Sequence, residues 1–222
     1  QEVVPDSGCG SWLFEPQSTN LVPYSEDFSQ WNNSDITIGA NGISPSGEVN
    51  ANLIQTGTTG GDQINEVYTL SATNTVTQSI YIKRVSGAEW VDFLIVKNGF
   101  SNSVKVWFNI NTGQVGGNIQ TGTTILDSAL IKDFGNGWYR LKVTTTDTTN
   151  NTSFNIRVRT AAADLSDTRV NNSSYYLWGA QLEQQSYATS YIPTEGSTVT
   201  RNQDVCINGG SLATINSTEG TL

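Results

Sequence analysis

The sequence contains no histidine and no methionine. The missing histidine excludes Ser-His-Asp triads, imidazole-ligated zinc and acid–base catalysis by imidazole. The missing methionine means that Gln1 is not an initiator residue, so we expect a processed product, an excised piece or part of a longer polypeptide. Long apolar runs are also missing: no stretch is long enough to cross a membrane as a helix, and the N-terminus lacks the apolar core of a secretory signal.

Cationic side chains are scarce. Eleven Lys and Arg stand against twenty Asp and Glu, which gives a formal net charge of -9 over 222 residues. Such a chain cannot form a broad phosphate-neutralising surface, so we expect no nucleic-acid partner. Only 14% of the residues are charged and 9% are aromatic, which argues against a disordered acidic segment. The length suffices for one large all-β domain with a sizeable core.

The only two cysteines, Cys9 and Cys206, lie near opposite ends of the chain. Because the termini of one domain often lie close together, a disulfide between them is one interpretation. Such a bridge would close nearly the whole chain and would contribute about 5 kcal/mol at most. Two unpaired thiols in a reducing compartment are the other interpretation, and the sequence leaves both open. Two distant cysteines without histidine do not predict a zinc site.

Patterns typical of β-strands dominate the sequence. Short stretches with alternating or continuous apolar character are typical of β-strands, and they occur at 76–83, 90–96, 104–110, 138–143, 154–159 and 175–182. The pair Asn136-Gly137 is the best hairpin signal. Gly179, inside the last stretch, indicates a bulge or close packing. Helical periodicity is weak, apart from one short turn near 25–31 that Ser25 could cap.

About ten short strands separated by Gly, Asn and Thr predict an all-β fold, a jelly-roll β-sandwich of two antiparallel sheets. We expect the sandwich domain to span residues 20–185. Residues 1–19 are predicted to form an extended N-terminal strap or linker, and residues 186–222 a C-terminal strap that leads towards a following module. These straps should lie on the sandwich or connect it to neighbours.

Six phrases resemble, in order and spacing, the carbohydrate-binding-module-like jelly-roll module of tailed-phage head-fibre and tail-fibre proteins. Related copies occur in secreted bacterial polysaccharide-degrading enzymes. The phrases are LFEPQSTNL at 13–21, YSEDF at 24–28 with Trp31, IYIK at 80–83, FGNGWYR at 134–140, WGAQLE at 178–183, and SYIPT at 190–194 leading to TVTR at 198–201. The resemblance covers nearly the whole chain. The loop at 44–48 departs from the family pattern, and Cys206 is not a family hallmark.

Exposed aromatic faces stack on the CH groups of sugar rings, so aromatic residues are the first candidates for a glycan site. We single out Trp90, Trp107 and Tyr139 as a stacking platform. Trp138 and Trp178 lie inside strong strand patterns and are expected in the core. A purely structural protein would instead bury Trp90, Trp107 and Tyr139 or place them in a subunit interface.

The resemblance also implies a structural calcium ion, because modules of this kind often hold one between an early loop and the last strand. Calcium needs six to eight oxygen ligands, and Glu26, Asp27 and Glu183 are the matching candidates. Solvated surface charge is the alternative for all three. No other cofactor is required.

No constellation in the sequence predicts catalysis. Acidic residues such as Asp62 and Asp92 occur singly. The sequence therefore does not indicate the pair of carboxylates that glycoside hydrolysis requires. We interpret Arg157, Arg159 and Arg169 as a modest basic group on solvated strand faces. We therefore expect a protein that is not an enzyme.

The first functional hypothesis is a virion fibre module, structural and glycan-binding, that acts in adhesion to host-surface or environmental polysaccharide. Its partners would be a glycan and other virion subunits or flanking domains, with a homotrimer typical of such fibres and no membrane partner. The second is a carbohydrate-binding module of a secreted bacterial polysaccharidase, which a disulfide would favour. The third is a capsid-decoration or spacer domain without a ligand.

Overall fold

The computed structural model describes residues 3–6, 9–12, 14–69, 75–97, 101–149 and 153–205. Cys206 lies outside the described residues, so both interpretations of Cys9 and Cys206, a disulfide and two unpaired thiols, stay open. No helix in the described part of the chain has the length and apolar character to cross a membrane. Among the residues that the structure describes, the one helical element is η1 (Phe28–Gln30), a single 3-10 turn. Asp27 caps it by accepting from the Ser29 amide, which corrects the expected cap at Ser25.

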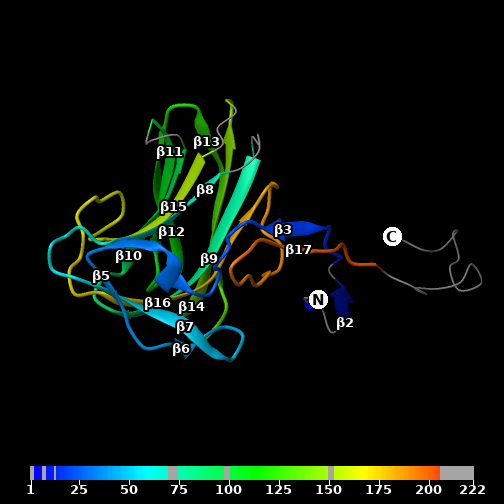
Figure 1. Cartoon of the computed structure of the whole chain (residues 1–222), viewed down its shortest axis with the longest axis horizontal. Coiled ribbons are helices and arrows are strands. Elements are labelled where there is room, and N and C mark those ends of the chain that lie inside the picture. The colour runs from blue at the N-terminus through cyan, green and yellow to red at the C-terminus, as the bar shows by residue number, and fades with distance from the viewer. Residues whose placement is uncertain are drawn as a thin grey trace, which may run out of the picture.

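Two antiparallel sheets form the body of the molecule (Figure 1). The six-stranded sheet has the order β12 (Gln114–Thr121), β11 (Asn102–Asn109), β10 (Trp90–Lys97), β15 (Ser153–Ala161), β8 (Gln63–Thr69) and β4 (Asn32–Ser34). The seven-stranded sheet has the order β13 (Thr124–Asp133), β14 (Trp138–Asp147), β9 (Thr75–Ser86), β16 (Ser174–Glu183), β7 (Val49–Thr56) and β5 (Ile36–Ile38), with β6 (Gly42–Ile43) also pairing with β7.

The strand order is that of a jelly roll. From β7 to β10 the chain alternates between the two sheets, and from β14 to β16 it alternates again. On its return, β16 inserts between β7 and β9 in one sheet, and β15 inserts between β8 and β10 in the other. This double Greek key defines the fold, and β12 and β13 extend one edge of each sheet. The predicted all-β jelly-roll sandwich is confirmed.

Local sequence signals account for the details of these strands. The β13–β14 hairpin turns at Gly135, Asn136 and Gly137, all with positive φ, as the Asn-Gly pair predicted. The register of β16 shifts between Trp178 and Gln181. Gly179 stands in that bulge with φ 61, and a Cβ there would lie 2.9 Å from the Tyr81 ring. The bulge expected at this glycine is confirmed.

The core lies between the two sheets and follows from the alternation of the strands. Residues of β10 such as Phe93, residues of β11 such as Phe108, and residues of β9 such as Ile80 point inward and are fully buried. Trp178 and Trp138 pack in a separate buried cluster with Tyr81. Both tryptophans are therefore buried, as their strand patterns predicted.

Described parts of both straps contact the sandwich: the Ser18 hydroxyl and the Thr189 amide donate to the Glu183 carboxylate of β16. In addition, β3 (Ser18–Asn20) pairs with β17 (Val199–Arg201). Asn20 is fully buried and makes four hydrogen bonds. Its amide nitrogen donates to the carbonyls of Ala180 at 3.0 Å and Ile192 at 2.8 Å. Its oxygen accepts from the backbone amides of Val22 and Leu182, each at 3.1 Å. One side chain thus ties the N-terminal strap to β16 and to the C-terminal strap. A further hairpin, β1 (Val3–Asp6) with β2 (Cys9–Trp12), precedes it.

Candidate functional site

The outer face of the six-stranded sheet carries a cluster of charged side chains. The core takes one side of each strand, so the alternate residues Asp92, Lys105, Arg157 and Arg159 point outward from β10, β11 and β15. Cross-strand pairing then sets Asp92 beside Arg159, and Arg157 one step along beside Leu94. The sheet register itself therefore assembles this cluster.

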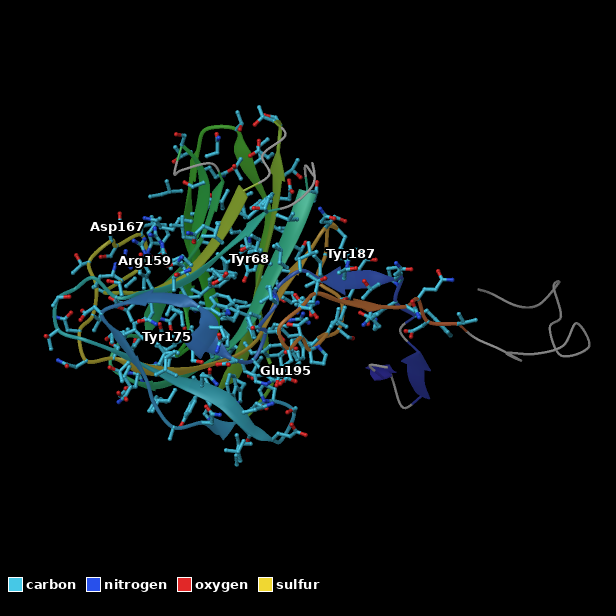
Figure 2. The ribbon with its side chains drawn as sticks, in the orientation of Figure 1. Tyr68, Arg159, Asp167, Tyr175, Tyr187 and Glu195 are labelled. Atoms are coloured by element: carbon cyan, nitrogen blue, oxygen red, sulfur yellow. The ribbon has the colours of Figure 1, made fainter. Side chains whose placement is uncertain are left out.

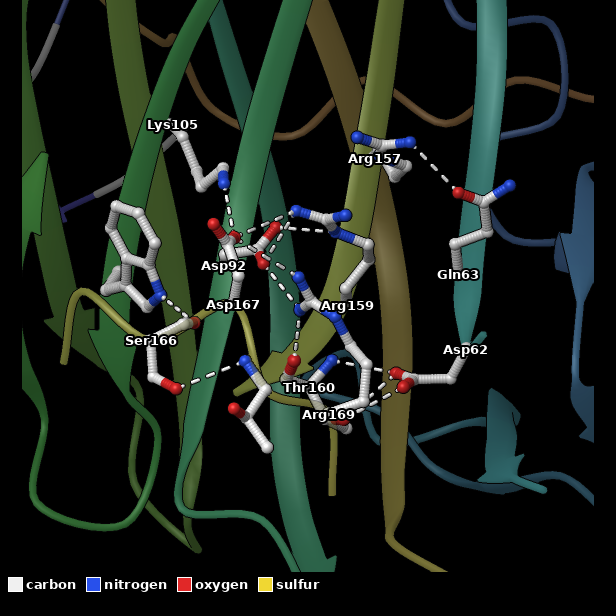
Figure 3. Close-up of polar contacts among 12 residues, drawn as sticks. Asp62, Gln63, Asp92, Lys105, Arg157, Arg159, Thr160, Ser166, Asp167 and Arg169 are labelled. Carbon is white, nitrogen blue, oxygen red and sulfur yellow. Dashed lines mark hydrogen bonds and ion pairs between the residues drawn. The ribbon is translucent and has the colours of Figure 1, made fainter. Parts of the chain in front are cut away.

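Asp92 is the centre of an ion-pair network (Figure 3). Its side chain is fully buried and receives two hydrogen bonds from Arg159, each 3.0 Å long. Arg169 adds a third, from Nη1 to Oδ2 at 2.6 Å, and also donates to the carbonyl of Thr160. A buried carboxylate needs such partners, because an unpaired charge in the interior is costly. The expectation that Arg159 and Arg169 belong to solvated strand faces is thus wrong: the buried Asp92 carboxylate holds both.

Residues 162–169, here called the covering loop, close over one part of this face. The carbonyl of Ser166 accepts from the Trp107 indole N–H at 2.9 Å. Asp167 binds the Lys105 ammonium at 2.5 Å, and Asp164 accepts from the Gly117 amide at 2.7 Å. A Cβ at Gly117 would lie 2.6 Å from the Leu165 side chain, so a larger residue there would require the exposed Leu165 side chain to shift.

Beyond the covering loop the face remains open and forms a groove of about 380 Å³. We call it the sheet groove. Leu94 and Ile119 supply its apolar surface, and the polar groups come from four cationic side chains and their neighbours. Its lining residues are Gly60, Leu94, Ser103, Lys105, Ile119, Thr121, Arg157, Arg159, Asp167 and Arg169. The groove combines cationic hydrogen-bond donors with a small apolar surface that is exposed chiefly at Ile119.

Burial and neighbouring side chains determine the protonation of the ionisable groups in and near the sheet groove. Burial, with the neighbouring Arg159, lowers the pKa of Arg157 to about 10, so this guanidinium remains protonated at neutral pH. Arg157 Nη1 donates to Gln63 at 3.0 Å, which holds the guanidinium towards β8. The hydrogen bond from Lys105 lowers the pKa of Asp167, which keeps that carboxyl ionised. Burial raises the pKa of Asp62 behind the groove, where Thr160 donates to it from both its amide and its hydroxyl.

The three predicted stacking residues do not form one platform. Trp107 points outward, but the covering loop leaves 0% of it exposed. Trp90 shares this face and is half-buried, with Gly116 packed over its ring. Tyr139 belongs to β14 in the other sheet and packs against the core. The alternation of Val104, Val106 and Phe108 towards the core forces Trp107 outward, and the distant covering loop then buries it.

The three predicted calcium ligands are not brought together either. Glu183 is fully buried and accepts from Ser18 Oγ at 2.5 Å and from Thr189 Oγ1 at 2.6 Å. Glu26 and Asp27 line a different hollow. Within the described ranges no group of three or more acidic or cysteine side chains is placed to hold a metal ion. Calcium binding itself stays a prediction.

The residues that build the sheet groove were only partly visible in the sequence. Arg157 and Arg159 stand two apart in an alternating strand, which predicts a shared face but not a shared partner. Lys105 was not predicted as a site residue, because no local sequence pattern distinguishes it. The aspartate inside the apolar run 90–96 is a signal from which a buried ion pair could have been inferred, although Asp92 was interpreted only as a single acidic residue.

Neither a family model nor a curated protein matches the sequence. Several solved structures are similar in fold. The CBM22-1 xylan-binding domain of Paenibacillus barcinonensis Xyn10C is 14% identical, with a TM-score of 0.44 over 77% of this chain and 94% of that one. The mannan-recognising module TmCBM27 is 18% identical, with a TM-score of 0.38 over 78% and 98%. A tailspike protein of bacteriophage CBA120 is 11% identical, with a TM-score of 0.41 over 73% of this chain and 21% of that one.

Proposed function

We propose that this chain is a non-catalytic glycan-binding module and that the sheet groove holds the glycan. The observation that carries the proposal is the groove itself, on the outer face of the six-stranded sheet, where four cationic side chains lie beside the apolar side chains of Leu94 and Ile119. Arg157 and Lys105 are placed to donate to hydroxyl or carboxylate oxygens of a sugar. Leu94 and Ile119 offer apolar contact to the CH faces of its rings.

The biological setting we propose is a phage fibre, in which the module binds host-surface or environmental polysaccharide. This part rests on the six phrases that resemble fibre modules. A groove without a deep pocket suits weak binding of an extended chain. Many copies on one particle would convert modest affinity into firm attachment, because linked sites raise the effective concentration. A trimeric fibre and other virion subunits belong to the same proposal.

Two alternatives remain. A carbohydrate-binding module of a secreted polysaccharidase would use the same groove, and only the neighbouring sequence separates it from a fibre module. A purely structural spacer predicts buried aromatic side chains, and the complete burial of Trp107 favours it. The spacer predicts no ligand in the groove, which makes it testable.

The test is binding to a broad polysaccharide and surface-glycan array, with the chain displayed multivalently. The Ile119→Asp variant alters the groove at an exposed position on β12, where 45% of the side chain is accessible. We expect it to weaken binding about tenfold, because it removes apolar contact and places a second carboxylate among the cations. The matched control is Val115→Asp, at a position on the same strand that is 41% exposed and lies outside the groove.

Retained binding in Val115→Asp with loss in Ile119→Asp supports the proposal. Equal loss in both variants, or no hit with the unaltered chain, would overturn it and leave the spacer as the account.

A chelator run on the same array addresses the calcium prediction. If calcium is structural, chelation lowers the melting temperature together with binding. An unchanged melting temperature and unchanged binding would contradict it.

A further inference from the structure

A second hollow of about 880 Å³ lies away from the sheet groove. We call it the strap hollow, because the C-terminal strap forms one of its walls, through Pro193, Thr194, Glu195 and Val199. Figure 2 shows Glu195 of the C-terminal strap well apart from Arg159 and Asp167 of the groove. The inner side of β7 forms another wall: Ile54 is in the core, Asn52 is buried at its edge, and Asn50 lines the hollow.

The walls of the strap hollow are fixed by hydrogen bonds between segments far apart in sequence. The Ser25 amide donates to Thr194 Oγ1 at 3.1 Å, and the Thr194 amide donates to Ser25 Oγ at 2.8 Å. The carbonyl of Tyr24 accepts from the Trp31 indole at 3.0 Å. Glu195 pairs with Tyr24 through a backbone bridge. A ligand would therefore meet a site that is already formed, which reduces the entropic cost of binding.

The charge of this hollow is negative. Glu26, Asp27 and Glu195 line it, and none of the described residues in its lining is Lys or Arg. Glu26 is held by Asn50 Nδ2 at 2.7 Å and by the Tyr191 hydroxyl at 3.0 Å, one on each oxygen. Each carboxylate oxygen has a further lone pair, so Glu26 can accept more. The hydrogen bond from the Ser29 hydroxyl lowers the pKa of Asp27, which keeps that group ionised.

The rest of the lining is suited to a hydroxylated ring. Asn41, Asn50 and Asn52 contribute amide groups, and Asn52 Nδ2 donates to Asn41 Oδ1 at 3.1 Å. Ile38, Pro193 and Val199 contribute apolar surface, and the half-buried Tyr24 contributes a ring. A bare metal ion would leave the apolar surface and the Tyr24 ring unused. A lysine side chain would leave the amides without partners.

We propose that the strap hollow binds a protonated amino sugar, with its ammonium group among the carboxylates and its hydroxyls on the asparagine amides. Carboxylates bind an ammonium by charge-assisted hydrogen bonds, and an aromatic ring adds attraction for a cation. This site is separate from the proposed glycan site in the sheet groove. The two proposals can fail independently.

The experiment is calorimetric titration of the whole chain with a glucosamine tetramer at mildly acidic pH. Because the sequence contains no histidine, no imidazole changes its protonation state in this pH range. An N-acetylglucosamine tetramer is the matched ligand, because acetylation removes the charge and keeps the ring. We expect the amine form to bind about tenfold more tightly. Glu195→Gln, at an exposed position, should weaken its binding about threefold. Added salt should weaken it as well.

Two control variants make the result specific. Glu48→Gln removes an exposed carboxylate outside the hollow, and Ile119→Asp alters the sheet groove. Both should leave binding of the glucosamine tetramer unchanged. The proposal is overturned if the two tetramers bind equally, if Glu195→Gln has no effect, or if the loss occurs only in Ile119→Asp. It is also overturned if a lysine tetrapeptide binds and the glucosamine tetramer does not.

Discussion

Replacing Asp92 by asparagine is expected to destabilise the protein by about 4 kcal/mol, because breaking one partner of a buried ion pair leaves uncompensated charge. Arg159 and Arg169 would then face a neutral amide in a site where Asp92 is now fully buried. In a domain of this size the melting temperature should fall by about 10 °C. Thermal unfolding followed by circular dichroism measures the change.

The matched control is Asp167→Asn in the same network. Asp167 is 66% exposed in its side chain and contacts Lys105, Arg159 and Arg169. Exposed ion pairs contribute about 0–1 kcal/mol, so the melting temperature should fall by a few degrees at most. If both variants lose the same small amount of stability, the network is not held by the buried carboxylate.

Asn20→Ala is the second substitution with a large expected effect. The asparagine makes four hydrogen bonds in a fully buried position, and alanine would leave two backbone N–H groups and two carbonyls without this partner. Each buried group left unsatisfied costs about 1–3 kcal/mol, so we expect a total of about 4 kcal/mol after partial relaxation. Denaturant unfolding monitored by tryptophan fluorescence gives the free energy of unfolding.

This variant also reports on the straps. Because Asn20 bonds to Ile192 and to β16, its loss should speed amide exchange in both straps before it affects the sheets. Thr19→Ala is the control, since the Thr19 hydroxyl hydrogen-bonds to the exposed Thr200 hydroxyl at 2.8 Å. A change of similar size in Thr19→Ala would show that the straps are held by β3–β17 pairing rather than by Asn20.

The fold was largely accessible from the sequence because its signals are local. Alternation in 104–110 placed Val104, Val106 and Phe108 on one side, and that side is the core. The Asn136-Gly137 pair predicted the hairpin, and Gly179 predicted the bulge. Periodicity of two and turn chemistry depend on neighbouring residues, so they can be read directly.

The candidate site was less accessible, because its contacts join distant residues. Ser166 caps Trp107 from 59 positions away, and Arg159 reaches Asp92 across 67. Alternation left the face of Trp107 ambiguous, and no local pattern indicates that a loop will cover it. The same holds for Glu183, which the family resemblance suggested as a calcium ligand and which lies in a buried hydrogen-bond network with Ser18 and Thr189.

The most direct test of the central claim, that the sheet groove binds a glycan, is an NMR titration with an oligosaccharide of the best array hit. Methyl groups of Leu94 and Ile119 report on the groove, and those of the exposed Leu130 on β13 serve as the reference. We predict saturable shifts at Leu94 and Ile119, with Leu130 unchanged. Shifts confined to Ile38 and Val199 would place the ligand in the strap hollow and contradict the claim, as would the absence of shifts at any of these methyl groups.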